Sequence, residues 1–152
     1  MAQRTAGITS EQDAYHELCA YTIDHARRDP SFIHQHVVDA FAAQRADGVS
    51  KPIGVLFALV GLYLHVEKHF TGAQVQRIHM QLGRRKRLWA RFDLPRDRGT
   101  ITSRDVMAVP PGPDRDQAID AWCASVWRAF ADSRPAVIEL LRQHGIDPGG
   151  AR

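Results

Sequence analysis

Cysteine is scarce in this sequence of 152 residues, and the two that occur, Cys19 and Cys123, form neither a CxxC pair nor another metal-binding spacing. A disulfide-rich secreted scaffold is therefore excluded, and we expect two buried thiols in a reducing compartment. The N-terminal stretch MAQRTAGITSEQ has no apolar core of the kind that a signal peptide needs. We therefore expect a cytoplasmic protein.

Long apolar runs and strand patterns are also missing. The longest apolar run, Ile53–Leu64, has 12 residues, which is too short to span a bilayer and is typical of a buried helix. No segment alternates apolar and polar residues with the period of two that a half-buried strand shows. The sequence therefore predicts an all-α protein without a membrane span.

Known catalytic signatures are absent as well. There is no GxSxG elbow, no Gly-rich phosphate loop and no Ser-His-Asp order. The net charge of +3 is mild, and acidic and basic residues are mixed along most of the chain, so composition alone does not indicate nucleic-acid binding. Whether the protein is an enzyme stays open, and metal-assisted hydrolysis or transfer would be the form of catalysis to test first.

Helical periodicity and start signals are what the sequence offers instead. Thr9, Thr71 and Thr102 each begin a capping box. We expect a compact bundle of four to five main helices plus a short helix, in one domain over 9–145, between a tail at 1–8 and a tail at 146–152. The expected helices cover about 10–27, 30–45 (after an Asp29-Pro30 start signal), 51–70, 72–90, 102–108, 114–132 and 134–144, the last closed by Gly145.

One stretch, FIHQHVVDAFAAQ at residues 32–44, resembles the hallmark of a bacterial family known as domain of unknown function 5946. Members carry His-Gln followed by Val-Asp-Ala-aromatic-Ala-Ala-Gln, which matches His34, Gln35 and residues 38–44. The segments Ile101–Met107 and Trp122–Trp127 also resemble the family, so the likeness covers most of residues 15–142. The resemblance implies membership of the family but no established activity.

Histidines on the expected helices form the first candidate site. His65 and His69 are four residues apart and would share a helix face. His34 and His36 lie about 200° apart on one helix, so only one of them can complete the site. With His16 or Glu17 from the first helix, these imidazoles would suit zinc, nickel or iron, and Asp39 would orient His36. The alternative is that His65 and His69 only cap the last turn of their helix.

Gln35 and Asp39 are also four residues apart and can hydrogen-bond along the helix. One hypothesis places them with His34 as the polar floor of a ligand pocket. The other makes them a buried clamp between helices, and we favour the clamp because most polar groups in cores are structural.

The basic segment 84–91, which contains Arg84, Arg85, Lys86, Arg87 and Arg91, is the second candidate site. Arginines beside Trp89 suit an anion or a partner protein, although basic residues also stabilise a helix C-terminus without any ligand. A single basic tract argues against nucleic acid. The leading hypothesis is therefore metal or small-ligand binding between helices, and the alternative is an interaction protein that docks a partner or an anion through segment 84–91. A homodimer stays open.

Overall fold

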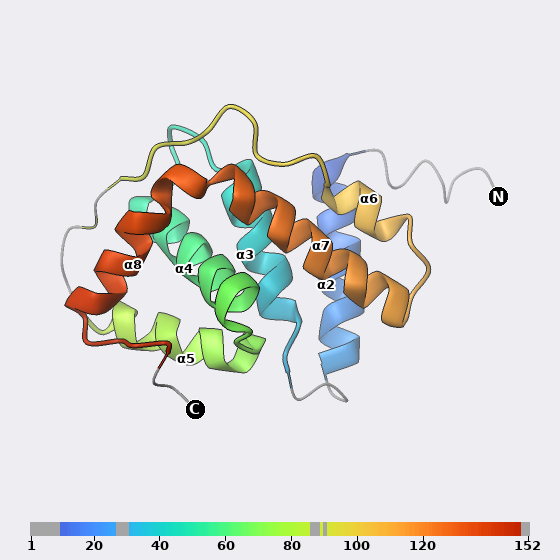
Figure 1. Ribbon diagram of the computed structural model, residues 1–152. Helices are drawn as coiled ribbons and strands as arrows, with labels where there is room; N and C mark the ends of the chain where they lie inside the picture. The colour runs from blue at the N-terminus through green and yellow to red at the C-terminus, as the bar shows by residue number, and fades with distance from the viewer. Residues whose placement is uncertain (1–9, 27–30, 86–88, 90, 150–152) are drawn as a thin grey trace.

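The computed structural model describes residues 10–26, 31–85, 89 and 91–149 (Figure 1). The helices are α2 (Glu11–Ala26), α3 (His34–Arg45), α4 (Pro52–Lys68), α5 (Gly72–Gly83), α6 (Ser103–Met107), α7 (Pro113–Ala129) and α8 (Arg134–Gln143), with a 3-10 turn at Ala131–Ser133. The described residues include no strand, and the predicted all-α class is confirmed.

The helix that carries the family motif, α3, lies at the centre of the bundle. It contacts α2, α4, α5 and α7, and its contact with α4 is the most extensive in the molecule. Figure 1 shows α7 crossing α3, with α6 beside α2 at one end and α8 beside α4 at the other. Polar residues of α3 can therefore meet side chains from four other helices.

The apolar sequence of α4 explains why it packs so closely on α3. Leu59, Val60 and Leu64 of α4 are fully buried, and they share one buried core with Trp122 of α7 and with Phe130, which follows α7. Each such side chain stabilises the fold by roughly 1.5–3 kcal/mol through removal of apolar surface from water.

Two of the predicted helix starts are confirmed. Thr71 Oγ1 accepts a hydrogen bond from the Gln74 amide while Gln74 Oε1 accepts one from the Thr71 amide, and Thr102 and Asp105 form the same reciprocal pair. The predicted start at Thr9 lies outside the described residues. At the start of α2, Ser10 Oγ accepts a hydrogen bond from the Asp13 amide at 3.0 Å and caps the helix.

The start of α3 differs from the prediction. The Asp29-Pro30 signal lies outside the described residues, but Ser31 and Phe32 are described and are not helical. Phe32 has a left-handed backbone (φ 57°), and its carbonyl lies against the α-carbon of Gly72, where a Cβ would overlap it. The Ala73 amide also donates to the Ser31 carbonyl, so α5 holds this segment in a turn and α3 begins only at His34.

Two helix ends were also predicted too late. The prediction that α5 continues to residue 90 was wrong, because it ends at Gly83 and the next described residues, Arg84 and Arg85, are not helical. Helix α4 ends at Lys68, where His69 takes the left-handed cap conformation (φ 58°) and lets Thr71 begin the next helix. The left-handed cap at Gly145 is confirmed at φ 71°.

None of the helices in the described ranges combines the length and the apolar character needed to cross a membrane.

Candidate functional site

The histidine ambiguity on α3 is settled by the packing. His36 is 4% exposed, and its ring lies flat on the ring of His65 from α4, with centroids 3.5 Å apart and an interplanar angle of 15°. His34 points to the other side, where Nδ1 lies 2.8 Å from the Thr22 hydroxyl of α2. Burial lowers the pKa of His34. His36 is therefore the histidine that reaches α4.

His65 has hydrogen-bond partners on both ring nitrogens. Nε2 lies 2.9 Å from Asp120 Oδ1 on α7, and Nδ1 lies 3.3 Å from the Phe70 carbonyl oxygen. Asp120 remains 60% exposed at its side chain, so this histidine–aspartate pair reaches the surface.

The four-histidine metal set predicted from the sequence is not assembled in the described part of the chain. His16 and His69 are exposed, and no group of three or more His, Cys, Asp or Glu is placed to hold a metal ion there. His69 lies beyond the end of α4, so its predicted helical alignment with His65 no longer applies. Imidazole binds a metal through a nitrogen in the ring plane, and the nearly parallel rings of His36 and His65 do not converge on one point.

Gln35 and Asp39 form the predicted hydrogen bond, with Gln35 Nε2 donating to Asp39 Oδ1 at 3.1 Å. Asp39 is 3% exposed, and its Oδ2 has no hydrogen-bond partner within the described residues. That oxygen lies against Gly61 of α4, in space that a Cβ would need. Burial raises the pKa of Asp39 well above its usual value, because the charged form of the carboxyl group is poorly solvated there. This arrangement favours the clamp hypothesis.

The side chains near Asp39 are also held in uncharged forms. Burial raises the pKa values of Tyr15, Cys19 and Cys123. The Cys123 thiol contacts the His36 carbonyl oxygen at 3.6 Å, and the Tyr15 ring stacks on Phe41. A thiol with a raised pKa is a poor nucleophile at neutral pH, so neither cysteine is suited to covalent catalysis.

Gln44, the last residue of the motif, joins the three segments that resemble the family. Its Nε2 donates to the Ile101 carbonyl at 2.8 Å and to the Arg98 carbonyl at 3.2 Å, and its Oε1 accepts from Trp122 Nε1 at 3.0 Å. The segments 101–107 and 122–127 therefore meet the motif helix at this one side chain. Two residues of the motif, Asp39 and Gln44, therefore have structural roles.

The second candidate site lies at the end of α5, beside the end of α8. Arg84 and Arg85 border a cavity of about 190 Å³, and no carboxylate lines it. Neither guanidinium makes an ion pair or a hydrogen bond within the described residues. Lys86 and Arg87, which the sequence placed in the same site, lie outside the described part of the chain. The other residues that line the cavity are Gln81, Leu82, His144 and Ile146.

Asp120 is a site residue that the sequence did not single out. It belongs to α7, and its partner His65 is 55 positions away. No spacing rule links two residues on different helices, so only the crossing of α4 and α7 could reveal the pair.

Comparison with known proteins gives a family but no function. The model of the family of unknown function DUF5946 matches residues 9–131. The chain belongs to this family. The match to DUF5946 includes the motif helix and both segments that meet it at Gln44. Among curated proteins and among solved structures, no match to the chain is found.

Proposed function

We propose that the protein is a docking protein that binds an acidic, partly apolar segment of a partner protein along the exposed side of α5. The observation that carries this proposal is the cleft at the end of α5, which two arginines line and no carboxylate borders. Unpaired guanidinium groups with no acid nearby have their donors available to the carboxylates of a partner.

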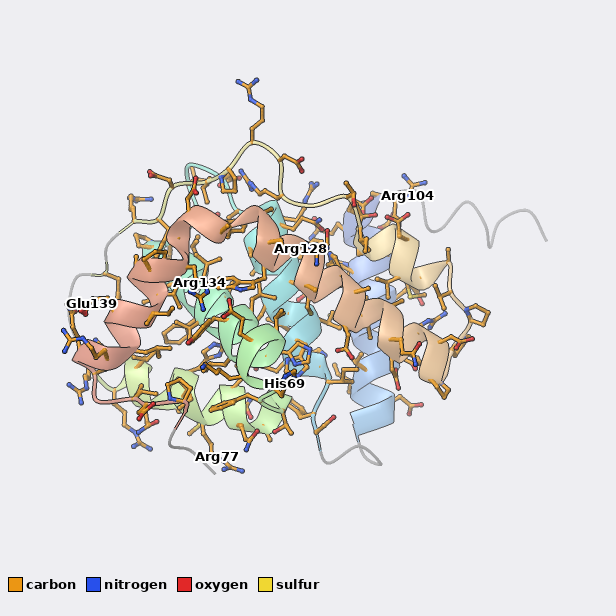
Figure 2. The ribbon with its side chains drawn as sticks, in the orientation of Figure 1. His69, Arg77, Arg104, Arg128, Arg134 and Glu139 are labelled. Carbon is orange, nitrogen blue, oxygen red and sulfur yellow. The ribbon has the colours of Figure 1, made fainter. Side chains whose placement is uncertain are left out.

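The charge distribution along this part of the chain supports the proposal. Residues 71–92 contain six arginines and lysines and no aspartate or glutamate. Arg77 is exposed, projects outward from α5 and has no acidic partner within the described residues (Figure 2). We name Arg77, Met80, Arg84 and Arg85 the basic face of α5. Opposite charge on a partner would steer its approach and fix its orientation.

An apolar anchor is present in the middle of the basic face. Met80 is 57% exposed, and it follows Arg77 by three positions and precedes Arg84 by four. Arg77 and Met80 are therefore neighbours on the helix surface, and the Arg84 amide donates to the Met80 carbonyl at 3.2 Å just beyond the helix end. Flexible methionines suit partner surfaces because they adapt to different apolar side chains. A partner segment with acidic and apolar residues on one side therefore fits this face better than a purely acidic one.

A helix end without a ligand is the simpler explanation for Arg84 and Arg85, because cations stabilise a helix C-terminus. It does not explain the exposed Met80 or Arg77, which lie earlier in the helix. The docking proposal accounts for all four residues with one surface.

The proposal is tested by fluorescence anisotropy with a fluorescein-labelled amphipathic peptide that carries glutamate and leucine on one side. We expect the charge reversal Arg84→Glu with Arg85→Glu to weaken binding at least tenfold. The matched control reverses Arg45, which is exposed at the end of α3, and Arg96, which is exposed in the loop between α5 and α6. Equal losses in both double variants would show attraction by net charge alone and would overturn the proposal.

A second function is favoured by the 2.9 Å separation of His65 Nε2 and Asp120 Oδ1. Ligands about 2.1 Å from a metal lie about 3.0 Å apart in octahedral geometry and about 3.4 Å apart in the tetrahedral geometry of zinc, so this pair fits two positions on an octahedral nickel or iron ion better than a zinc site. Of the histidines predicted to bind metal, this pair contains His65, and His36 stacks on the His65 ring. Elemental analysis of protein purified without chelator tests it, because the metal must disappear in His65→Ala and remain in His69→Ala.

A further inference from the structure

We infer that a second binding site, for a small organic phosphate, lies in the groove between the start of α2, the end of α3 and the loop that leads into α6. Two cavities form this groove and share Glu11 and Thr102. One has a volume of about 560 Å³ and the other about 310 Å³. The site is separate from the basic face of α5 and from the histidine pair, and no residue of either lines it.

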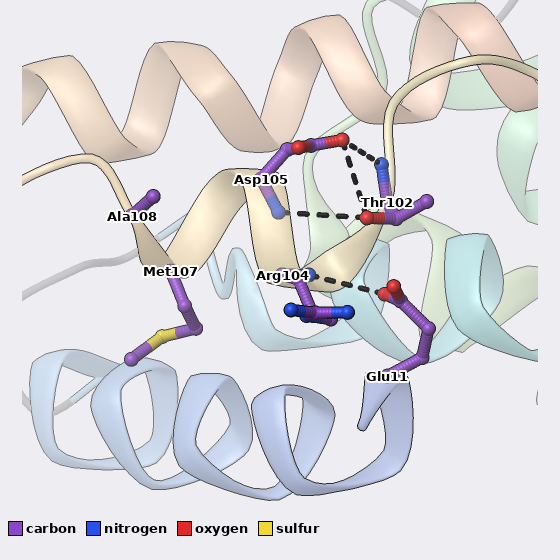
Figure 3. A pocket seen from close by; sticks show the side chains of 6 residues that line it. All are labelled: Glu11, Thr102, Arg104, Asp105, Met107 and Ala108. Carbon is purple, nitrogen blue, oxygen red and sulfur yellow. Dashed lines mark hydrogen bonds between the residues drawn. The ribbon is translucent and has the colours of Figure 1, made fainter. Parts of the chain in front are cut away.

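The acidic side chains of the groove are already used by the fold. Glu11 Oε1 accepts from the Ser103 hydroxyl at 2.9 Å and from the Arg104 amide at 3.1 Å. Asp105 Oδ2 accepts from the Thr102 amide at 2.9 Å, and Asp97 Oδ1 accepts from the Gly99 amide at 3.0 Å. Figure 3 shows two of these contacts around α6, with Glu11 turned toward the Arg104 backbone and Asp105 turned back to Thr102.

The basic side chains of the groove are not used in this way. Arg45, Arg96 and Arg104 line it and are exposed, and none of them makes an ion pair or a side-chain hydrogen bond within the described residues. The groove therefore has carboxylates that cap backbone amides and guanidinium groups that have no acceptor. An anion that entered it would meet unsatisfied donors.

Arg98 supplies a fixed donor between them. Its Nε donates to the Pro95 carbonyl at 2.9 Å, and its Nη1 donates to the carbonyl oxygens of Gln44 and Ala46 at the end of α3. Its Nη2 makes no hydrogen bond within the described residues. A guanidinium that the backbone already holds loses little conformational freedom when it binds an anion, which favours affinity. Arg98 lines the same cavity as Arg45 and Arg96.

The shape of the groove indicates the class of ligand. The arginines Arg45, Arg96 and Arg98 gather in one cavity, while Met107 and Ala108 line the other beyond Thr102. Phosphate accepts several hydrogen bonds and pairs with guanidinium in a bidentate way. A ligand with a phosphate at the arginine end and a less polar body toward Met107 fits both cavities, whereas inorganic phosphate would fill only one.

Two-dimensional ¹H–¹⁵N NMR titration of the full chain tests this inference with adenosine monophosphate, ribose 5-phosphate, adenosine and inorganic phosphate. We expect at least one organic phosphate to bind with a Kd below about 1 mM and to shift the amides of Gly99, Thr100 and Thr102. The variant Arg45→Gln with Arg96→Gln should weaken that binding at least tenfold. Arg84→Gln with Arg85→Gln, on the docking face, should leave it unchanged.

Three results would overturn the inference. The first is that neither organic phosphate binds. The second is that the organic phosphates bind no more tightly than inorganic phosphate, which would mean an adventitious ion only. Binding that survives Arg45→Gln with Arg96→Gln would place the ligand elsewhere. Because the docking variants serve as the control here, failure of this inference leaves the docking proposal untouched, and failure of docking leaves this inference untouched.

Discussion

The carboxyl group of Asp39, the only acidic residue of α3, lies directly against the α-carbon of Gly61 in α4. A Cβ at residue 61 would overlap Oδ2 of Asp39 and press on the Val75 side chain. Glycine is therefore required at this position by the close approach of the two helices.

Replacing Gly61 with alanine should lower the free energy of unfolding by about 1–3 kcal/mol, because the added methyl overpacks a buried contact. Gly54 provides the matched control in the same helix, since a Cβ there meets nothing within 4 Å. Gly54→Ala should raise stability by about 0.5–1 kcal/mol through reduced backbone entropy of the unfolded chain. Urea unfolding of both variants measures the difference, and equal effects would contradict the close approach.

Asp39 should make the protein less stable as pH rises. Its folded pKa lies well above the usual value of 3.8, so between these two values the folded state holds a proton that the unfolded state has lost. The free energy of unfolding therefore decreases from about pH 4 upward on account of this residue. Asp39→Asn keeps the shape and removes the titration, so its stability relative to the native protein should rise with pH. A constant difference between pH 4 and pH 8 would exclude a neutral Asp39.

His79 should act in the opposite direction. Its Nε2 donates to the Phe57 carbonyl at 2.7 Å, its ring stacks on Phe57, and burial lowers its pKa below 6.5. Below about pH 6.5 this histidine is protonated in the unfolded chain before it is protonated in the folded protein, so the free energy of unfolding decreases as pH falls. His79→Gln should reduce this acid sensitivity in thermal melts at pH 7 and pH 5. A variant as acid-sensitive as the native protein would show that His79 titrates normally.

Gln44→Leu should cost about 1–3 kcal/mol, because it leaves the buried Trp122 N–H and the Ile101 carbonyl without their partner. It should also shift the tryptophan fluorescence, as the loop 98–101 is no longer tied to the end of α3. Gln76→Leu on the exposed surface of α5 is the control and should change stability by less than about 0.5 kcal/mol. A silent Gln44→Leu would contradict the role we assign to this residue.

Local signals in the sequence were sufficient for much of the fold. The capping boxes at Thr71 and Thr102 and the left-handed Gly145 depend only on residues within a few positions, and the structure confirms them. The start of α3 could not be predicted, because Phe32 is held by Gly72 and α5, 40 positions away. The end of α4 at Lys68 also differed from the prediction, and it leaves room for Thr71 to cap the next helix.

For the candidate sites too, a contact within one helix could be predicted from the sequence, whereas contacts between helices could not. The Gln35–Asp39 bond is a contact within one helix and follows from spacing. Nothing local indicated that His36 would stack on His65, that Asp120 would join them, or that Arg45 and Arg96 would line one groove. The predicted histidine set assumed one continuous helix through His69, whereas α4 ends at Lys68. Side chains from separate helices meet according to helix crossings, which sequence spacing does not specify.

The most direct test of docking is to map where the labelled acidic peptide binds. In ¹H–¹⁵N NMR spectra of the full chain, the account predicts that the peptide shifts the amides of residues 76–83 on α5, of Arg84 and Arg85 beyond its end, and of Gly145 and Ile146 beside the cleft. These shifts should vanish with Arg84→Glu and Arg85→Glu. Shifts confined to residues 99–105 or to the neighbourhood of His65 and Asp120 would place the binding surface elsewhere and contradict the docking function.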